Sequence, residues 1–450
     1  MEFMMAFGWA SVMLIIGVLL RAKVSFLRTM LVPASVVAGI IGFVAINILW
    51  GYGIDIGTKG DMFTEIVNHL FTISFISITL TSTKLVGKKR NSVLQGALGM
   101  GIVWCILYAL TPLLGTMIVS LVGRRVKMDA MYGMLIQFGF CQGPGQAAAF
   151  GELFEQFGWK NATTVGISFS VIGFIAAFLI GIPFAKLGIK KGIAKNCGDI
   201  DATILKGYYS KDEQKTTLVK DTTCNSNIET LTFHLAVIGV CYVMAIGISK
   251  ILGFIPGFLG TSMSGMMFMN GMYAAYIMKF VLNKLNLEFL IDDTLQSKIT
   301  GWTADYLVVC AFMAVEIEII RAWIAPIIIV SAVVTIVTAW TCIYFGSRIG
   351  GTNDFERILG LYGMCTGTVP SGLALIRIVD PNFDTTTAIE LGACNLIMIA
   401  CTPVYIVILG LAAGSFSIHL AMVLLVVCCL VYLMLLKITK CWGKQTISWK

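Results

Sequence analysis

Two short stretches of the sequence carry the residues best suited to bind a small ligand. The first contains Gln142 and Gln146 within a run of glycine and proline, and the second contains Thr366, Thr368 and Ser371 in a similar run. Glycine and proline interrupt helices, so backbone amides and carbonyls are left without helical partners beside these side chains. Free amides can bind anions, and free carbonyls can bind cations.

The two stretches match each other at a constant offset. Residues 138–143 read FGFCQG, and residues 362–367 read YGMCTG, 224 positions later. Each stretch lies in a moderately apolar segment, at about 129–155 and 354–379, that is broken by Gly and Pro and flanked by longer apolar spans. A matched pair of interrupted segments is typical of the substrate site of a secondary transporter.

Arg377 is the charged residue that stands out after the second run, seven positions beyond Pro370. A guanidinium is costly in a membrane unless it faces protein or water, and its planar fork suits a carboxylate. We therefore expect Arg377 to be buried near the second run and to bind a substrate carboxylate. An ion pair with Asp380 or Asp384, or extension of the side chain toward the cytoplasm, is the alternative.

The composition places these segments in an α-helical membrane protein. Of 450 residues, 58% are hydrophobic and 12% are charged, whereas soluble domains carry about 25% charged residues. The apolar runs are continuous, which excludes a membrane β-barrel. We predict eleven spans, at about 4–20, 30–50, 64–83, 94–122, 161–186, 231–252, 258–283, 301–320, 322–346, 386–412 and 415–436.

The distribution of basic residues predicts the orientation of the chain. With the N-terminus outside and the C-terminus in the cytoplasm, 24 of the 32 Lys and Arg lie in cytoplasmic loops and 7 lie outside, as the positive-inside rule requires. Because the basic residues lie in short loops beside spans, the net charge of +8 does not indicate nucleic-acid binding. Residues 190–230 form a polar cytoplasmic linker between two halves, 1–189 and 231–450, which are predicted to be inverted repeats.

Three sequence blocks resemble the bacterial sodium/glutamate symporters. They are GPGQAAAF at residues 143–150, FGWKNAT at residues 157–163 and GTVPSG at residues 367–372. The resemblance implies an elevator-type secondary transporter with two re-entrant loops, which forms a homodimer in the plasma membrane. It also implies sodium-driven uptake of glutamate or a related acidic amino acid, with no cofactor other than the coupling sodium ion.

The resemblance and the residue types together give the expected site. We expect substrate binding by Arg377, Gln142, Gly143, Gly145, Gln146, Thr368 and Ser371, and sodium binding by Thr366, Gly367, Asn395, Cys141 and Asn161. The hydroxyls could instead cap short helices, and Asn395 could join two helices by a hydrogen bond. Sodium is favoured over a proton because neither stretch offers a clear buried carboxylate or histidine to titrate.

Other functions follow less well from the sequence. A transporter of another small carboxylate or amino acid with different ion coupling remains the main alternative. A channel can also use re-entrant loops, but two unlike inverted loops favour alternating access. The sequence contains no GxxxxGK[ST], HExxH or GxSxG pattern, so an ATP-driven pump or an intramembrane enzyme is not expected.

Overall fold

The computed structural model describes residues 1–29, 32–81, 90–194, 196–197, 221–224, 226–351, 353–381 and 383–447. In this part of the chain every regular element is a helix, which confirms the all-α prediction. Eight of these helices are long and apolar enough to cross a membrane. They are α1 (Glu2–Lys23), α3 (Ala34–Gly51), α4 (Gly60–Leu80), α5 (Arg90–Val122), α8 (Ala162–Lys190), α10 (Thr230–Leu252), α15 (Ile324–Gly346) and α20 (Ile418–Ile438).

The predicted span 258–283 is divided in the structure. It forms α11 (Phe258–Gly265) and α12 (Met267–Lys284), with a break at Met266. The side-chain amide of Asn270 donates to the carbonyl oxygen of Met263 at 3.1 Å. This contact satisfies a backbone group that the break releases from the helix, which sequence hydropathy could not reveal.

The predicted span 301–320 is displaced. Its helix, α13 (Asp293–Met313), begins earlier because the Asp292 side chain caps it and accepts from the backbone N–H of Leu295 at 2.8 Å. Capping by an aspartate is a strong helix start. The polar residues of this first part made it look like a loop by hydropathy alone.

The predicted span 386–412 is also interrupted. It forms α18 (Thr387–Cys394), a 3-10 segment (Asn395–Cys401) and α19 (Thr402–Ala412), with a bend of 43°. Pro403 lies in the first turn of α19. Proline lacks a backbone N–H and cannot continue the preceding helix, which accounts for the break.

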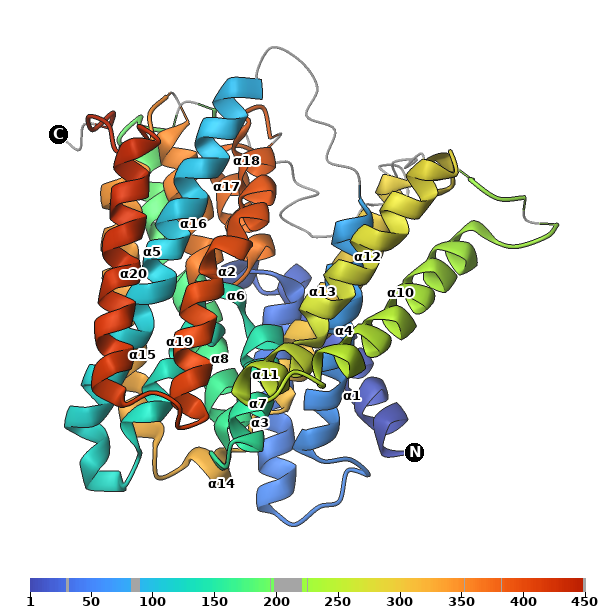
Figure 1. Cartoon of the computed structure of the whole chain (residues 1–450), viewed down its shortest axis with the longest axis horizontal. Coiled ribbons are helices and arrows are strands. Elements are labelled where there is room, and N and C mark those ends of the chain that lie inside the picture. The colour runs from blue at the N-terminus through green and yellow to red at the C-terminus, as the bar shows by residue number, and fades with distance from the viewer. Residues whose placement is uncertain are drawn as a thin grey trace. The chain divides into compact units, whose positions relative to one another are not determined.

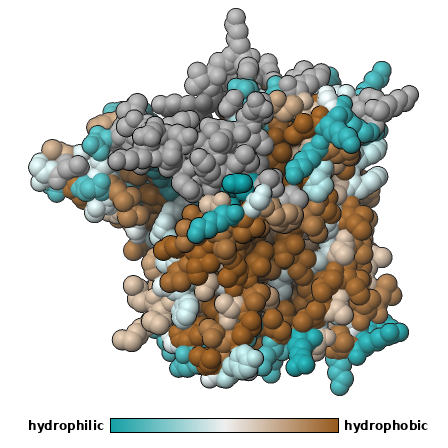
Figure 2. Space-filling view, turned by 180° about the vertical axis from the view of Figure 1, so that it is seen from behind, coloured by the Kyte–Doolittle hydropathy of each residue, from teal (hydrophilic) through white to brown (hydrophobic). Residues whose placement is uncertain are grey.

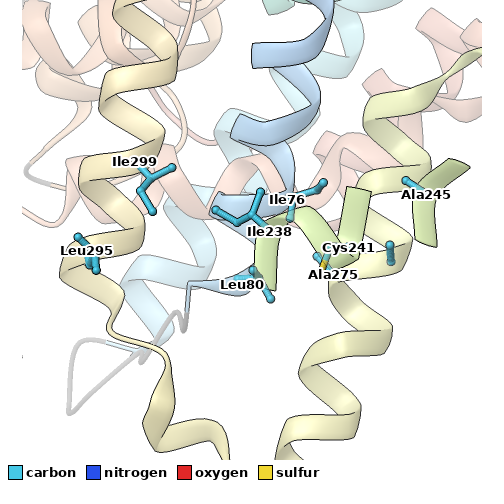
Figure 3. Close-up of a cluster of buried hydrophobic side chains, with 9 residues drawn as sticks. Ile76, Leu80, Ile238, Cys241, Ala245, Ala275, Leu295 and Ile299 are labelled. Atoms are coloured by element: carbon cyan, nitrogen blue, oxygen red, sulfur yellow. The ribbon is translucent and has the colours of Figure 1, made fainter. Parts of the chain in front are cut away.

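One compact unit comprises Met1–Gly17, Ala38–Lys84 and Tyr209–Ala314. Its apolar core joins α4, α10, α12 and α13 through Ile76, Leu80, Ile238, Cys241, Ala245, Ala274, Ala275, Leu295 and Ile299 (Figure 3). Two polar contacts supplement this core. Ser77 Oγ donates to Gln296 Oε1 at 2.6 Å, and the buried His234 accepts from the backbone N–H of Asp292 at 2.8 Å through Nε2.

The other unit comprises Val18–Val37, Leu85–Tyr208 and Val315–Lys450. It contains both segments that the sequence predicted to be broken, as α6 (Ile136–Gln142), α7 (Pro144–Gln156), α16 (Asp354–Thr366) and α17 (Val369–Val379). Helix α8 packs against all four of them, and α5 packs against α15 and α20 (Figure 1). Both units draw on both halves of the chain. The division into inverted repeats stays a prediction, and most of the linker 190–230 lies outside the described residues.

The surface is rich in hydrophobic side chains. Figure 2 shows one face on which these side chains form a broad field, with hydrophilic ones toward its edges. Helix α20 alone exposes Leu420, Val423, Val426, Val427, Leu430, Val431, Met434, Leu435 and Ile438. Such a large apolar surface is unfavourable in water and favourable in hydrocarbon, which identifies a multi-pass membrane protein.

Helices α16 and α17 approach each other through glycine. A Cβ atom at Gly363 would lie 2.7 Å from the Gly372 Cα, and a Cβ atom at Gly372 would lie 2.4 Å from the Gly360 carbonyl oxygen. The blocking atoms belong to the backbone and cannot move aside as a flexible side chain can. The close pairing of α16 with α17 therefore requires glycine at these positions.

We predict that Gly372→Ala destabilises the protein. Overpacking of this kind costs about 1–3 kcal/mol, so the thermal unfolding midpoint of the purified variant should fall. The matched control is Gly247→Ala in α10, where a Cβ atom would meet nothing within 4 Å. There alanine should be neutral or stabilising, because it favours the helix. A Gly372→Ala protein that melts at or above the wild-type temperature would contradict the packing argument.

Candidate functional site

Each of the two broken segments forms a pair of helices joined by a non-helical tip. In the first hairpin, α6 ends at Gln142 and α7 begins at Pro144, with Gly143 between them at φ +76°. That backbone conformation is readily available to glycine. In the second hairpin, α16 ends at Thr366 and α17 begins at Val369. The helix breaks therefore lie where the Gly/Pro runs predicted them.

The two tips contact each other. A Cβ atom at Gly143 would lie 2.5 Å from Thr368 Cγ2 and 3.2 Å from the Gly367 carbonyl oxygen. The Cys141 thiol donates to the carbonyl oxygen of Cys365 at 3.8 Å, a contact between residues 224 apart in sequence. We call this meeting of residues 141–145 with residues 365–371 the hairpin crossing.

Most of the predicted site residues lie at the hairpin crossing. Gln142, Gly145, Thr366 and Ser371 are buried there, and Thr368 is partly exposed. The Thr366 hydroxyl donates to the Tyr362 carbonyl oxygen at 2.7 Å, as a threonine inside a helix commonly does. The crossing thus brings together neutral amides, hydroxyls and carbonyls from two distant parts of the chain.

The helix ends give the crossing a characteristic electrostatic pattern. Helices α7 and α17 both begin there, so their unpaired N–H groups and positive dipole ends converge. Helix α16 ends there and leaves its last carbonyl oxygens without intrahelical partners. The arrangement offers donors for an anionic group and oxygens for a cation in one place.

Gln146 has partners that the sequence did not reveal. Its Nε2 donates to the Tyr405 hydroxyl at 3.0 Å, and its Oε1 accepts from the Tyr108 hydroxyl. The two hydroxyls also lie 3.0 Å apart, and all three side chains are buried. This network fastens the start of α7 to α5 and α19. The sequence did offer one signal for this network. Tyr108 and Tyr405 each lie within an apolar span, and a buried tyrosine hydroxyl needs a hydrogen-bond partner.

Aromatic rings support the same side of the first hairpin. Phe138 of α6 stacks on Phe150 of α7 with 3.9 Å between ring centroids, and Phe150 stacks on Tyr405 at 5.2 Å. Trp104 of α5 donates from Nε1 to the Cys141 carbonyl oxygen at 3.2 Å. These contacts fix the position of the first tip.

Arg377 does not lie where the sequence analysis expected. Its side chain is exposed rather than buried, and its Cζ atom lies over the Phe383 ring, 4.9 Å from the centroid. It is eight residues along α17 from Val369, about 12 Å by helical rise. The alternative ion pair is also absent among the described residues. Asp380 instead accepts the backbone N–H groups of residues 384 and 385.

Two further predicted sodium ligands lie away from the crossing or outside the described side chains. Asn161 is exposed at the start of α8, in a left-handed conformation with φ 59°. Thr163, two residues later, packs against Gly151 of α7, which is seven residues from Pro144, so Asn161 lies at least about 10 Å from the tip by helical rise. The backbone of Asn395 belongs to the 3-10 segment that follows α18, but its side chain is outside the described part.

A buried ionic cluster at the base of the second hairpin was missed by the sequence analysis. Arg357 donates from Nε and Nη2 to both carboxylate oxygens of Glu390, at 2.7 and 2.9 Å, and from Nη1 to Asp354 at 2.8 Å. The three side chains are at most 2% exposed. The sequence around Arg357 does not indicate this pair, because the partner Glu390 is 33 residues away. A bidentate pair of this kind fixes α16 to α18.

The C-terminal residues extend this cluster. Thr446 Oγ1 donates to Asp354 Oδ2 at 2.6 Å, and the Thr446 backbone N–H donates to the Ser347 carbonyl oxygen at 2.9 Å. The Gly443 N–H donates to the Arg348 carbonyl oxygen at 2.8 Å. The end of the chain therefore packs against the base of α16.

The sequence of the chain is similar to those of known proteins. A profile of the family described as sodium/glutamate symporter matches residues 1–385, a range that includes both hairpins. The sodium/glutamate symporter of Escherichia coli (strain K12) is 22% identical over 388 residues, covering 83% of this chain and 88% of the relative. That of Haemophilus influenzae (strain ATCC 51907 / DSM 11121 / KW20 / Rd) is 22% identical over 383 residues, with the same coverage.

Proposed function

The chain belongs to the sodium/glutamate symporter family, and from that premise we propose that it carries glutamate, or a related acidic amino acid, across the plasma membrane together with sodium. It is a transporter rather than an enzyme. The coupling ion is sodium, which is cargo of the reaction and not a resident cofactor. The observation that carries the proposal is the contact between the two hairpin tips, at Gly143 and Thr368.

The chemistry of the crossing suits this pair of substrates. Convergent helix N-termini favour the carboxylates of an acidic amino acid, while the carbonyl oxygens at the end of α16 suit a sodium ion. No carboxylate or histidine among the described residues lies in either tip. A proton would therefore have no group to titrate there, which favours sodium as the driving ion.

The proposal also covers the transport cycle and the assembly of the protein. We propose that the two hairpins are re-entrant loops of inverted repeats and that they move together in an elevator-type cycle. The family resemblance further implies a homodimer. Light scattering of the detergent-solubilised protein measures that assembly, and a monomeric mass would contradict it.

The first prediction from this proposal concerns the coupling of glutamate transport to sodium. Purified protein in liposomes should accumulate radiolabelled glutamate above the external concentration when an inward sodium gradient is imposed. Potassium or choline in place of sodium should abolish accumulation, because neither fits oxygens arranged for sodium. Excess unlabelled carboxylates in the same assay rank the substrates and test the alternative of another small carboxylate.

Two outcomes of this assay would contradict the proposal. Accumulation driven by a pH gradient alone, with sodium absent, would identify proton coupling. Glutamate flux that runs only down its gradient, without accumulation, would identify a channel.

A second prediction concerns orientation. The excess of basic residues on one side supports our proposal that the N-terminus is outside and the C-terminus is in the cytoplasm. Fluorescent and phosphatase reporters fused after residue 210 and at the C-terminus should both report a cytoplasmic location. An external signal after residue 210 would contradict the inverted arrangement of the two halves.

A third prediction tests how far the substrate site extends from the tips. Arg377 has an exposed side chain about 12 Å along α17 from the tip, and we propose that the substrate site extends far enough for it to bind a carboxylate. Arg377→Ala should then raise the glutamate Kd about tenfold or more, the effect expected for a lost charge-assisted hydrogen bond. Arg377→Lys should restore only part of the affinity, because it keeps the charge but loses the planar fork. Isothermal titration of purified, monodisperse protein measures the Kd.

The matched variant for this experiment is Ser371→Ala, at the crossing itself. It should weaken glutamate binding whether or not Arg377 takes part. An unchanged Kd in both Arg377 variants, with a raised Kd in Ser371→Ala, would remove Arg377 from the site and confine recognition to the tips.

A further inference from the structure

We propose that the hydroxyls of Ser170 in α8 and Thr338 in α15 are sodium ligands, which complete a cation site with the carbonyl oxygens at the end of α16. This inference rests on the proposed sodium-coupled function and assigns it two residues outside both hairpins. Neither residue lies in a Gly/Pro run or in a block that resembles the family.

The first observation is that both hydroxyls are buried without a partner. Ser170 and Thr338 are each 0% exposed, and neither Oγ atom has a hydrogen-bond partner among the described residues. A serine or threonine within a helix commonly donates to the carbonyl four residues earlier, and Ser168 and Thr335 do so here. An unsatisfied buried hydroxyl costs about 1–3 kcal/mol, so a bound ion or water is expected.

The packing of α8 places Ser170 against both hairpins. A Cβ atom at Gly166 would lie 3.0 Å from the Ala147 carbonyl oxygen of α7, and one at Gly173 would lie 2.5 Å from the Thr366 carbonyl oxygen. Ser170 lies between these glycines on the same helical face, since residues three and four apart are neighbours. Ser170 also lies close to α6, because a Cβ atom at Gly139 would be 2.7 Å from the Ser170 backbone nitrogen.

The packing of α15 brings Thr338 to the same level. Near the base of the second hairpin, a Cβ atom at Gly346 would lie 2.7 Å from Ile358 Cγ1. One turn along α15, Cys342 lies close to Tyr362 and Cys365 of α16. Thr338 is one further turn along α15, eight residues from Gly346. Thr366, the last residue of α16, is likewise eight residues from Ile358, so by helical rise the two residues lie at a similar level. Helices α8 and α15 pack against each other, and each packs against α16, so Ser170 and Thr338 belong to the two helices that border the end of α16.

The resulting set of ligands is all oxygen and carries no formal charge. It comprises the two hydroxyls and the terminal carbonyls of α16, including those of Thr366 and Gly367, which face α8 and the first tip. Hard cations prefer oxygen ligands, and unwound backbone carbonyls at a helix end are a known way of holding sodium in transporters. A neutral set binds a monovalent ion weakly enough to release it on the other side of the membrane.

The test is a sodium titration of the purified full-length protein at constant ionic strength, with choline chloride as the balancing salt. The thermal unfolding midpoint is followed, because a ligand that binds the folded state raises it in proportion to occupancy. The sodium concentration for half of the maximal shift should rise about tenfold in Ser170→Ala and in Thr338→Val. It should stay near the wild-type value in Thr338→Ser, which keeps the oxygen.

The matched control is Ser331→Ala. Ser331 is another fully buried hydroxyl of α15 without a partner, but it lies seven residues from Thr338, about 10 Å along the helix. Its sodium curve should match the wild type. If Ser331→Ala raised the sodium concentration for half of the maximal shift by the same factor, a general loosening of α15 would explain the effect. That result would overturn the inference.

The remaining outcomes separate this inference from the proposed function. A wild-type protein that responds to sodium, with unchanged curves in Ser170→Ala and Thr338→Val, would overturn the assignment of these ligands and point to a buried water instead. The sodium-coupled function would then still stand. A wild-type protein whose stability and glutamate uptake are both indifferent to sodium would overturn both.

Discussion

Backbone hydrogen bonding inside hydrocarbon is the constraint on which this structure depends. A helix that breaks within a membrane releases amides and carbonyls that lipid cannot satisfy. The chain buries its breaks in protein. The Trp104 side chain bonds the Cys141 carbonyl, the Cys141 thiol bonds the Cys365 carbonyl, and Asn270 satisfies the separate break between α11 and α12. The two hairpin tips are buried because each supplies part of the surroundings of the other.

Small residues make that mutual burial possible. Four glycines of α8 lie where a hairpin comes close: Gly166 against Ala147, Gly173 against Thr366, Gly181 against Leu375 and Gly188 against Phe355. One long helix therefore packs against both hairpins along its length. Because both tips rest on α8 and on each other, a change in the position of one tip alters the surroundings of the other. A site built in this way responds as a unit to what binds it.

Charged and neutral polar groups occupy different places in the second hairpin. The charges gather at its base, where Arg357 pairs with Glu390 and Asp354. Loss of one partner in such a buried pair would leave an uncompensated charge, so the pair holds a fixed geometry. The tip instead presents hydroxyls and carbonyls. A rigid ionic base and a neutral tip fit the proposed role of this hairpin, which is to hold its shape while its tip binds and releases an ion.

The sequence by itself determined the membrane class, most of the spans and the two broken segments. Hydropathy and the positions of Gly and Pro are local properties, and lipid enforces them directly. Local patterns fail where polar side chains find distant partners. Arg357 looked like a loop charge, and the N-terminal part of α13 looked like a loop. Only the tertiary structure decided that Arg377 points outward onto Phe383, that Gln146 is held by Tyr108 and Tyr405, and that the Ser170 and Thr338 hydroxyls are buried without a partner among the described residues. The direction of a side chain around its helix acquires meaning only from the helices packed against it, and those come from elsewhere in the chain.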